Sequence, residues 1–334
     1  MIRTQIEEKI DRGEQKAYRE IWTNSQSWAT TRVMPHLPIV HAPAYDAGFA
    51  PGHRFPMGKY TRLMELIEET GLGSMARFHR PAPAAAAWLE LAHHRLYVDQ
   101  VLACNVPALI EREIGFQVDE RVSLRARLAT AGTVMAARLA LAEGIACNTA
   151  GGSHHARRAQ GAGFCIFNDV AVAAQLLLAD GEAGRVLVLD LDVHQGDGTA
   201  EICNGIEAIR TVSMHGEKNY PVRKQISTID VALPDNLRDE AYLETLDWLL
   251  PRTVEGFVPD LVFYNAGVDP HEEDRLGRLS LTDQGLRDRD RKVFSFFRER
   301  DIAIASVLGG GYSHDIDAIA RRHLLTFEAA LEFV

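Results

Sequence analysis

Two polar residues, Asp192 and His194, close the apolar run in the segment VLDLDVHQGDG. They stand two positions apart at the predicted end of a strand, so both side chains project to the same side. A carboxylate and an imidazole are good zinc ligands, and the segment YNAGVDP supplies a third candidate, Asp269. Three protein ligands leave the fourth position of a tetrahedral site open for water, which is typical of catalytic zinc. The residues therefore predict a catalytic zinc centre, with simple capping of the next helix as the structural alternative.

The segment GGSHHA places two histidines, His154 and His155, directly after a predicted strand and two glycines. Glycine allows the backbone to turn tightly, so both rings are expected to face one cavity although they are adjacent. Asp190 and Asp197 are the spare carboxylates of the neighbouring motif, and each is expected to fix the charge and tautomer of one ring. Two His–Asp pairs beside a zinc-activated water would form a general acid and base system.

Two aromatic residues follow glycines in the same part of the chain. Tyr312 comes after three glycines in LGGGYSHD, and its phenol is expected to donate a hydrogen bond to a developing oxyanion. Phe164, in GAGFCIFND, is expected to line a narrow channel for an aliphatic chain, although taken alone it favours a core position. The neighbouring Cys165 is expected to be a packing residue.

Six short apolar runs without strict alternation indicate strands that are buried on both faces of a parallel sheet. They are LPIVHAP, GIACNTAGG, RVLVLDLDVH, IRTVSMH, DLVFYNAGVD and IAIASVLGGGY. Helical segments separate these runs, which indicates β–α–β units and an α/β fold. Ligands of open parallel sheets gather outside the carboxyl ends of the strands. Because the polar residues stand at those ends, the sequence predicts a single shared site.

Helices are expected at residues 58–73, 83–103, 119–144 and 168–181. A second histidine pair, His93 and His94, falls on the second of these helices and is expected to consist of surface or packing residues. Residues 217–240 are expected to form a surface loop region. The charged N-terminal stretch predicts a helical arm, residues 1–35, followed by one catalytic domain, residues 36–334, because no repeat or linker interrupts the chain.

The composition excludes several classes of protein. The chain has 334 residues and a net charge of −10, so a broad electrostatic contact with nucleic acid or an anionic membrane is not expected, whereas basic partners are tolerated. Its start lacks the apolar core of a signal peptide, and no apolar run approaches the length of a membrane span. The four cysteines are scattered and form no CxxC pair, which indicates a reducing, cytoplasmic location. Oligomers are compatible with all of this.

Together these motifs resemble those of the zinc-dependent histone deacetylase family, in the arginase/deacetylase superfamily. The matching runs are GGSHHARRAQGAGFCIFNDVAVA, DLDVHQGDGT, NAGVDPHEEDRLGRLSLT and GGGYS. The run PGHRFPMGKY, residues 51–60, is similar to the N-terminal signature of bacterial and class IV members. The resemblance covers the chain apart from the N-terminal arm. It implies the single-domain arginase/deacetylase α/β fold, with a central eight-stranded parallel sheet flanked by helices.

The resemblance also implies a role for each site residue. The implied zinc ligands are Asp192, His194 and Asp269. The implied catalytic residues are His154, His155, Asp190, Asp197 and the oxyanion donor Tyr312. The implied walls of an acyl-lysine tunnel are Gly163, Phe164 and Tyr220. A structural K⁺ (or Na⁺) site is implied at Asp190, Asp192 and His194, with main-chain oxygens near Ser213 and Met214.

Departures from the family pattern bear on the substrate. GGSHH replaces the proline-glycine lead of class I members and is closer to class IV, and Gln195 stands where many members have a second histidine. These changes leave the implied reaction intact, which is hydrolysis of an N-acyl-lysine amide, but they leave the acyl chain and the amine carrier open. Alternatives are deacetylation of acetylpolyamines or other small N-acyl-amines, and a non-catalytic acyl-lysine reader. An arginase-like ureohydrolase with two manganese ions is disfavoured, because Gly196 stands where a bridging aspartate would be needed.

Overall fold

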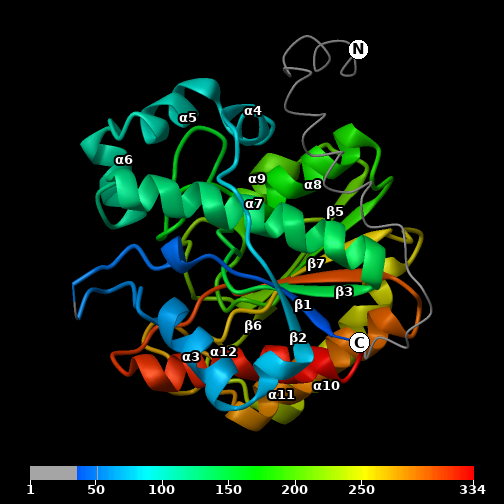
Figure 1. Cartoon of the computed structure of the whole chain (residues 1–334). Coiled ribbons are helices and arrows are strands. Elements are labelled where there is room, and N and C mark those ends of the chain that lie inside the picture. The colour runs from blue at the N-terminus through cyan, green and yellow to red at the C-terminus, as the bar shows by residue number, and fades with distance from the viewer. Residues whose placement is uncertain (1–35, 51) are drawn as a thin grey trace, which may run out of the picture. The chain divides into compact units, whose positions relative to one another are not determined.

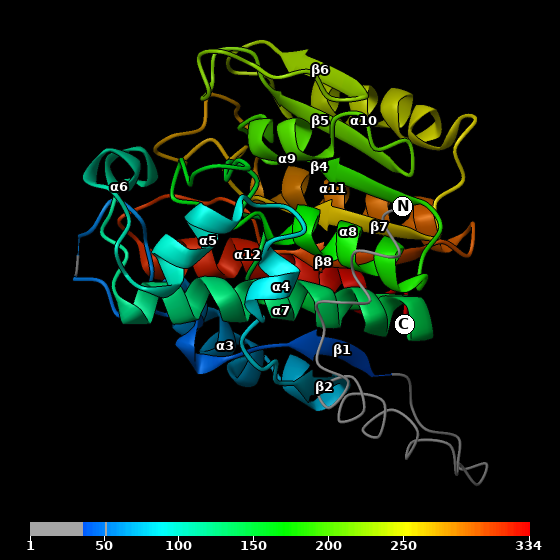
Figure 2. The ribbon, with the colours of Figure 1, turned by 90° about the horizontal axis from the view of Figure 1, so that it is seen from above.

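Eight parallel strands form one sheet, in the order β2-β1-β3-β8-β7-β4-β5-β6 (Figures 1 and 2). The structure is a computed structural model that describes residues 36–50 and 52–334, so the predicted N-terminal arm lies outside the described residues. The strands are β1 (Leu37–Val40), β2 (Ala76–His79), β3 (Ile145–Asn148), β4 (Val186–Asp190), β5 (Ile209–Gly216), β6 (Ile229–Leu233), β7 (Leu261–Asn265) and β8 (Ala303–Val307). The expected α/β class and the eight-stranded parallel sheet are confirmed.

Helices cover both faces of this sheet. On one face lie α7 (Glu120–Glu143), α8 (Asp169–Asp180) and α9 (Asp197–Cys203), with α4 (Ala86–Leu89), α5 (Arg95–Leu102) and α6 (Ala108–Ile114) nearby (Figure 1). On the other face lie α3 (Lys59–Glu69), α10 (Asp239–Val254), α11 (Asp283–Arg298) and α12 (Ile316–Leu331). Short 3-10 turns occur at Pro43–Tyr45 and Leu72–Met75. Among the described residues, no helix is both long enough and apolar enough to span a bilayer.

The central strands contribute to two cores. In β4, Val186 and Val188 pack in the same apolar cluster as the buried face of α8, whereas Leu187 and Leu189 pack in the cluster that includes α11 and α12. All four side chains are buried. This explains why the run shows no alternation of apolar and polar residues, as is usual for parallel sheets covered on both faces.

The helices that follow the predicted boundaries begin at side-chain caps. Asp119 accepts a hydrogen bond from the backbone N–H of Val122 at 2.9 Å at the start of α7. Asn168 does the same for Ala171 at 3.0 Å at the start of α8. Each cap satisfies a backbone donor that the first turn of a helix leaves free. These two helices pack on each other beside the strand that leads into GGSHH.

Three elements differ from the expectation. The strands β2 and β6 were not expected, and β6 lies inside the region 217–240 that was expected to be loop. Both are edge strands, and both leave part of their side chains exposed, so neither has the continuous apolar sequence of the inner strands. The expected helix at 83–103 is broken into α4 and α5.

The break in that helix lies at the second histidine pair. The His93 ring is buried and contacts two backbone groups, the Arg157 carbonyl at 2.8 Å and the Asn168 N–H at 2.9 Å. His94 is exposed, adopts an extended conformation and precedes α5. The backbone N–H of His94 donates to the Arg158 carbonyl at 2.7 Å, and this long-range bond replaces the local helical bond. The pair therefore supplies one packing residue and one surface residue.

Candidate functional site

The candidate site lies where four neighbouring strands, β3, β8, β7 and β4, reach their carboxyl ends. The chain after β3 carries the histidine pair, the chain after β4 carries Asp192 and His194, and the chain after β7 carries Asp269. The chain after β8 carries the three glycines and Tyr312. Segments that are far apart in sequence thus meet at one edge of the sheet, where ligands of open parallel sheets bind.

Asp192, His194 and Asp269 form a buried cluster whose candidate ligand atoms all lie within 4.8 Å of one another. His194 Nδ1 lies 3.0 Å from Asp192 Oδ1 and 3.0 Å from Asp269 Oδ2. The remaining carboxylate oxygens accept backbone hydrogen bonds, from Gly310 to Asp192 at 2.7 Å and from Val193 to Asp269 at 2.8 Å. The backbone therefore orients both carboxylates toward the imidazole.

The electrostatics of this cluster fit a divalent metal. Burial, together with the negative charge of Asp192, raises the pKa of Asp269 to about 7. Although burial lowers it, the two carboxylates raise the pKa of His194 to about 10 because they favour a positive charge between them. The two carboxylates attract positive charge, and together with the imidazole they match the donor set of zinc. These three residues would hold the ion.

The histidine pair forms two separate His–Asp pairs. His154 Nδ1 lies 2.7 Å from Asp190 Oδ2, and His155 Nδ1 lies 2.6 Å from Asp197 Oδ1. The two Nε2 atoms lie 3.1 Å apart, so both rings present their inner nitrogens to the same space. Although burial lowers it, the charges of Asp190 and Asp192 raise the pKa of His154 to about 9, whereas burial and the charge of His154 lower the pKa of His155 to about 4.

A tight turn gives the adjacent rings this orientation. Gly151 and Gly152 have φ angles of +86° and +81°, which side-chain-bearing residues rarely adopt. The buried carboxylate of Asp169 accepts the N–H groups of Gly152 at 3.0 Å and Ser153 at 2.7 Å, and the hydroxyl of Thr133 at 2.6 Å. Asp169 thus ties the turn to α7 and α8. Sequence reasoning missed this residue, although its position directly after the helix cap was visible.

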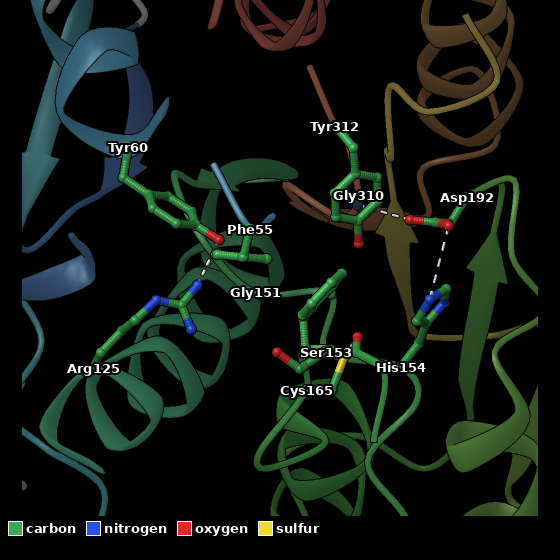
Figure 3. A pocket seen from close by; sticks show the side chains of 14 residues that line it. Phe55, Tyr60, Arg125, Gly151, Ser153, His154, Cys165, Asp192, Gly310 and Tyr312 are labelled. Carbon is green, nitrogen blue, oxygen red and sulfur yellow. Dashed lines mark hydrogen bonds and ion pairs between the residues drawn. The ribbon is translucent and has the colours of Figure 1, made fainter. Parts of the chain in front are cut away.

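Tyr312 lies beside the proposed metal ligand His194. Its ring lies 6.0 Å from the His194 ring and 5.7 Å from the Phe164 ring, edge-on and tilted respectively. The buried ammonium of Lys59 lies 3.2 Å from the Gly309 carbonyl and so supports the glycine loop before Tyr312. In Figure 3 the Tyr312 hydroxyl points into the pocket. Lys59 was missed because nothing in the run PMGKY reveals its distant partner.

The predicted tunnel residues lie around His155. The Tyr220 ring meets the His155 ring edge-on at 4.8 Å. A Cβ on Gly163 would lie 2.6 Å from Cδ2 of His155, so only glycine fits beside that ring. Phe164 has a φ of +67°, and its backbone N–H is held by the Ile114 carbonyl at 2.8 Å. The loop thus holds Phe164 in a backbone conformation that non-glycine residues rarely adopt.

A pocket lies beside His154 (Figure 3). Its lining includes His154, Asp192 and Tyr312, and also Tyr60, Arg125, Ser153 and Cys165. The Arg125 side chain is buried and donates hydrogen bonds to the Tyr45 carbonyl at 2.9 Å and to the Tyr60 hydroxyl. Ser153, the small residue that departs from the family pattern, thus lines the pocket and leaves room there. Cys165 lines the same pocket as well as packing in the core.

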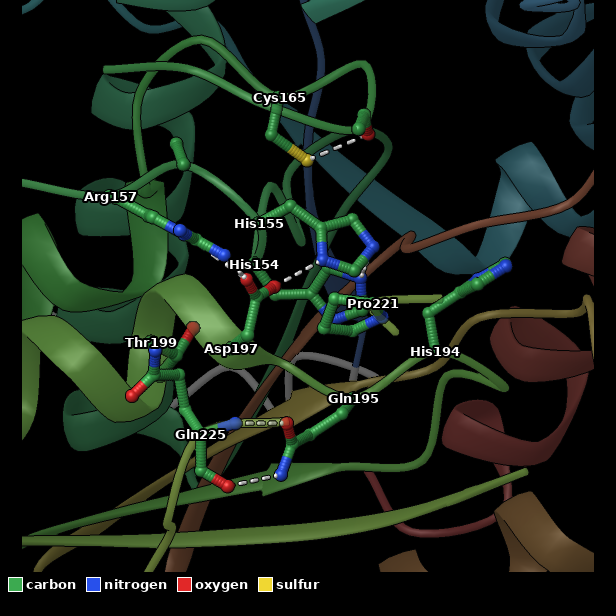
Figure 4. A network of polar contacts seen from close by, with 12 residues as sticks. His154, His155, Arg157, Cys165, His194, Gln195, Asp197, Thr199, Pro221 and Gln225 are labelled. Carbon is green, nitrogen blue, oxygen red and sulfur yellow. Dashed lines mark hydrogen bonds and ion pairs between the residues drawn. The ribbon is translucent and has the colours of Figure 1, made fainter. Parts of the chain in front are cut away.

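Two further residues that sequence reasoning missed support the His–Asp pairs. Arg157 donates two hydrogen bonds to Asp197 Oδ2, at 2.7 Å and 3.2 Å (Figure 4). Asn265 donates from Nδ2 to Asp190 Oδ1 at 2.9 Å. Asn265 ends an apolar run just as Asp190 does, which is a signal that could have identified it. The role of Arg157 depends on a partner forty positions away, and no local pattern reveals it.

The expected monovalent cation site remains a prediction. Asp190 and Ser213 are register partners on β4 and β5, so the expected residues are neighbours in space. The Ser213 hydroxyl lies 3.0 Å from His215 Nδ1, and Met214 is buried.

The chain is similar to a known protein family and to several known proteins. The family model described as "Histone deacetylase domain" matches residues 53–327. An uncharacterized protein of Picosynechococcus is 43% identical over 88% of this chain and 98% of its own length. Histone deacetylase 2 of Arabidopsis thaliana is 30% identical over 82% of this chain and 74% of its own length. The crystal structure of the HDA15 HD domain superposes with a TM-score of 0.75 at 20% identity and covers 90% of both chains, which supports the fold.

Proposed function

Because the chain belongs to the histone deacetylase domain family, we propose that it is a zinc-dependent amidohydrolase that removes acetyl or longer acyl groups from lysine side chains. One observation carries the proposal: two His–Asp pairs, a three-ligand metal cluster and a tyrosine meet at one edge of the sheet. This combination suits hydrolysis of an unactivated amide, which needs a polarised carbonyl, a deprotonated water and a protonated leaving amine.

The proposed reaction adds water across the amide bond. A zinc ion held by Asp192, His194 and Asp269 would polarise the acyl carbonyl and acidify a water molecule. Asp190 and Asp197 hold the Nδ1 atoms of the two histidines, so their Nε2 atoms face the reacting groups. One Nε2 takes a proton from water as the water oxygen bonds to the acyl carbon, and the other histidine gives the proton of its Nε2 to the amine nitrogen as the C–N bond breaks. The products are a carboxylate and a free amine.

Tyr312 is proposed to stabilise the oxygen of the acyl carbonyl as it gains negative charge. Burial, together with the charges of Asp192 and Asp269, raises the pKa of Tyr312 well above its ordinary value, so the phenol keeps its proton and remains a donor. A fixed donor of this kind stabilises charge without reorganisation at the moment of reaction.

A lysine carrier is favoured over a polyamine by the charge of the rim segment, which we define as residues Asn219–Ser227. This segment carries Tyr220, two basic residues, Arg223 and Lys224, and no acidic residue. Its positive charge would repel the free ammonium groups of an acetylpolyamine, whereas an acyl-lysine within a protein brings no obligatory extra charge. The proposed tunnel walls, Gly163, Phe164 and Tyr220, would surround the neutral acyl-lysine side chain.

The finer features of the sequence support further assignments. The runs PGHRFPMGKY and GGSHH support a class IV relationship, and the four free cysteines among the described residues support a reducing, cytoplasmic location. A catalytically inactive reader is disfavoured because each expected type of ligand, base and donor is present at this edge of the sheet. A two-metal ureohydrolase is disfavoured because the described residues form a single metal-binding group.

A substrate panel tests the proposed function. Purified full-length protein with zinc should hydrolyse acyl-lysine peptides, from acetyl to long fatty acyl, faster than acetylated polyamines. Asp192→Ala should lose both bound zinc, measured by elemental analysis, and activity. Faster turnover of acetylpolyamines would replace the lysine assignment, and stoichiometric zinc in Asp192→Ala would contradict the ligand set.

Removing the Tyr312 hydroxyl tests the oxyanion role. Tyr312→Phe should lower kcat on the order of 10²–10³-fold, because a preorganised donor is lost while the ring remains. Zinc content should stay at the wild-type level, since Tyr312 is not a proposed ligand. Near-wild-type turnover in Tyr312→Phe would contradict the assignment.

A further inference from the structure

Gln195 occupies an unusual position directly after His194. Its side chain is 1% exposed. The amide Nε2 donates to the Gln225 carbonyl at 2.8 Å and to Asp230 Oδ1 at 2.8 Å, and the Oε1 accepts the Gln225 backbone N–H at 2.8 Å (Figure 4). Both polar ends of the amide are therefore engaged by groups outside the metal cluster. Gln195 links the strand end that carries the ligands to the rim segment Asn219–Ser227.

Beyond Pro221, which is buried, apolar burial contributes little to holding the rim segment. Val222 and Ile226 are 96% and 87% exposed, so their side chains make almost no core contact. Polar contacts hold the segment instead: Lys224 Nζ donates to the Asn219 carbonyl at 2.6 Å and to the Pro221 carbonyl at 2.7 Å. These bonds stay within the segment, so they shape it without attaching it to the sheet.

The attachment to the sheet depends on a few contacts at the two ends. Asn219 donates to the Leu276 carbonyl at 2.7 Å at one end. At the other end, Asp230 accepts from both Gln195 and the Ser227 N–H, at 2.8 Å and 2.7 Å. Gln195 is the residue that ties this second end to the chain of the metal ligands.

The position of the rim segment matters because it carries Tyr220. The Tyr220 ring contacts the His155 ring edge-on at 4.8 Å and is 39% exposed, so one side faces the site and the other faces the entrance. A movement of the segment would move this proposed tunnel wall, while His155 would remain held by Asp197. Substrate binding would change and the proton-handling groups would not.

We propose that Gln195 is a positioning residue that clamps the rim segment Asn219–Ser227 and thereby sets the affinity for the acyl-lysine substrate. The proposal explains why an amide replaces the second histidine at this position. A planar amide pairs with a backbone N–H and C=O at once, and its second N–H remains free for Asp230. The affinity part rests on the proposed deacylase function, whereas the clamping part does not.

Three variants separate the clamp from the metal site. Gln195→Met removes the amide and keeps the length of the side chain. Asp230→Ala removes the shared carboxylate from β6, away from the metal ligands. Gln225→Ala is the matched control, because Gln225 pairs with Gln195 through its backbone alone.

Limited trypsin digestion measures how firmly the rim segment is held, and the measurement does not depend on enzyme activity. Arg223 is exposed, so the rate of cleavage after Arg223, followed by mass spectrometry, reports how often the segment detaches. Gln195→Met and Asp230→Ala should both be cut about tenfold faster than wild type, since two or three net hydrogen bonds are lost. Gln225→Ala should be cut at the wild-type rate. A wild-type rate in Asp230→Ala would overturn the proposal, whatever the zinc content of Gln195→Met.

Steady-state kinetics then test the consequence for binding. With an acetyl-lysine peptide, KM should rise about tenfold in Gln195→Met and Asp230→Ala while kcat stays within about twofold of wild type. A fall in kcat with unchanged KM in Asp230→Ala would overturn the assignment to affinity. If no acylated amine is a substrate, the proposed function fails, and the trypsin rates still decide on the clamp.

Discussion

The two His–Asp pairs of the site have nearly the same length but are built differently. Asp190, at the end of an inner strand, is supported by neutral donors, the Asn265 amide at 2.9 Å and the Asp192 N–H at 3.1 Å. Asp197, at the start of α9, is supported by the charged guanidinium of Arg157. Burial raises the pKa of Asp190, whereas the pKa of Asp197 is lowered despite burial, because His155 and Arg157 favour its charged form. The His154–Asp190 pair is thus held by neutral groups of the sheet, and the His155–Asp197 pair is held by the charge of Arg157.

Exchanging each carboxylate for an amide should have the largest effect. Asp190→Asn and Asp197→Asn place an NH₂ group against Nδ1, which forces the proton onto Nε2, so kcat should fall on the order of 10²–10⁴-fold in both. Asp190 accepts the Asp192 N–H, so the negative charge lost in Asp190→Asn lies beside a proposed zinc ligand. Asp190→Asn alone should therefore weaken zinc binding, measured by chelator competition. Equal zinc affinity in the two variants would remove the proposed difference between the pairs.

Two glycines allow each pair to be disturbed separately. A Cβ on Gly196 would lie 2.4 Å from Asp190 Oδ2, and a Cβ on Gly163 would lie 2.6 Å from His155 Cδ2. Both alanine variants should lower kcat on the order of 10²-fold by shifting a base. Gly163→Ala should in addition lose about 1–2 kcal/mol of stability in urea unfolding, because Gly163 has a φ of +53°. A wild-type kcat in either variant would show that the ring or carboxylate can move aside without cost.

His93 shows what a buried histidine does without a carboxylate. Burial lowers the pKa of His93 to about 4 from an ordinary value of 6.5. The neutral His93 ring therefore makes its full contribution to the free energy of unfolding above pH 6.5. This contribution is lost as the pH falls from 6.5 to 4, because the unfolded chain takes up a proton on His93 before the folded chain does. Between pH 7.5 and 5, wild type should lose about 2 kcal/mol through this group. Urea unfolding of His93→Gln should show a shallower pH dependence over this range, and an unchanged slope would contradict the assignment.

Removing the guanidinium charge of Arg157, which supports Asp197, should have the smallest effect. Arg157→Gln should lower kcat only about tenfold, since the Asp197 carboxylate keeps its bond to His155. Arg157→Lys should restore part of the lost kcat. The side chain of Arg157 is 31% exposed, so water can replace part of the contact. Arg158→Gln is the matched control, because that guanidinium contacts the Ile202 carbonyl instead. Equal losses in Arg157→Gln and Arg158→Gln would indicate a general effect on the loop.

The sequence allowed the inner strands and the meeting of the site residues to be predicted, because continuous apolar runs ending in polar residues are a local pattern. The edge strands β2 and β6 lack that pattern, and pairing with an inner strand alone makes them strands. The break at His93 and the contacts of Arg157, Lys59 and Gln195 all depend on partners distant in sequence. Local sequence contains no record of such partners, and these contacts therefore appeared only in the structure.

The double burial of the inner strands has a consequence for the lifetime of the site. The strands β4, β7 and β8 lie between two cores, so their amide hydrogens are expected to exchange with solvent only when the whole domain unfolds. The residues at their ends share that protection, whereas the edge strand β6 and the segment before it can open far more often. The site residues at the ends of the inner strands are therefore expected to keep their arrangement as long as the domain stays folded. The rim segment and β6 can open and close many times within that period.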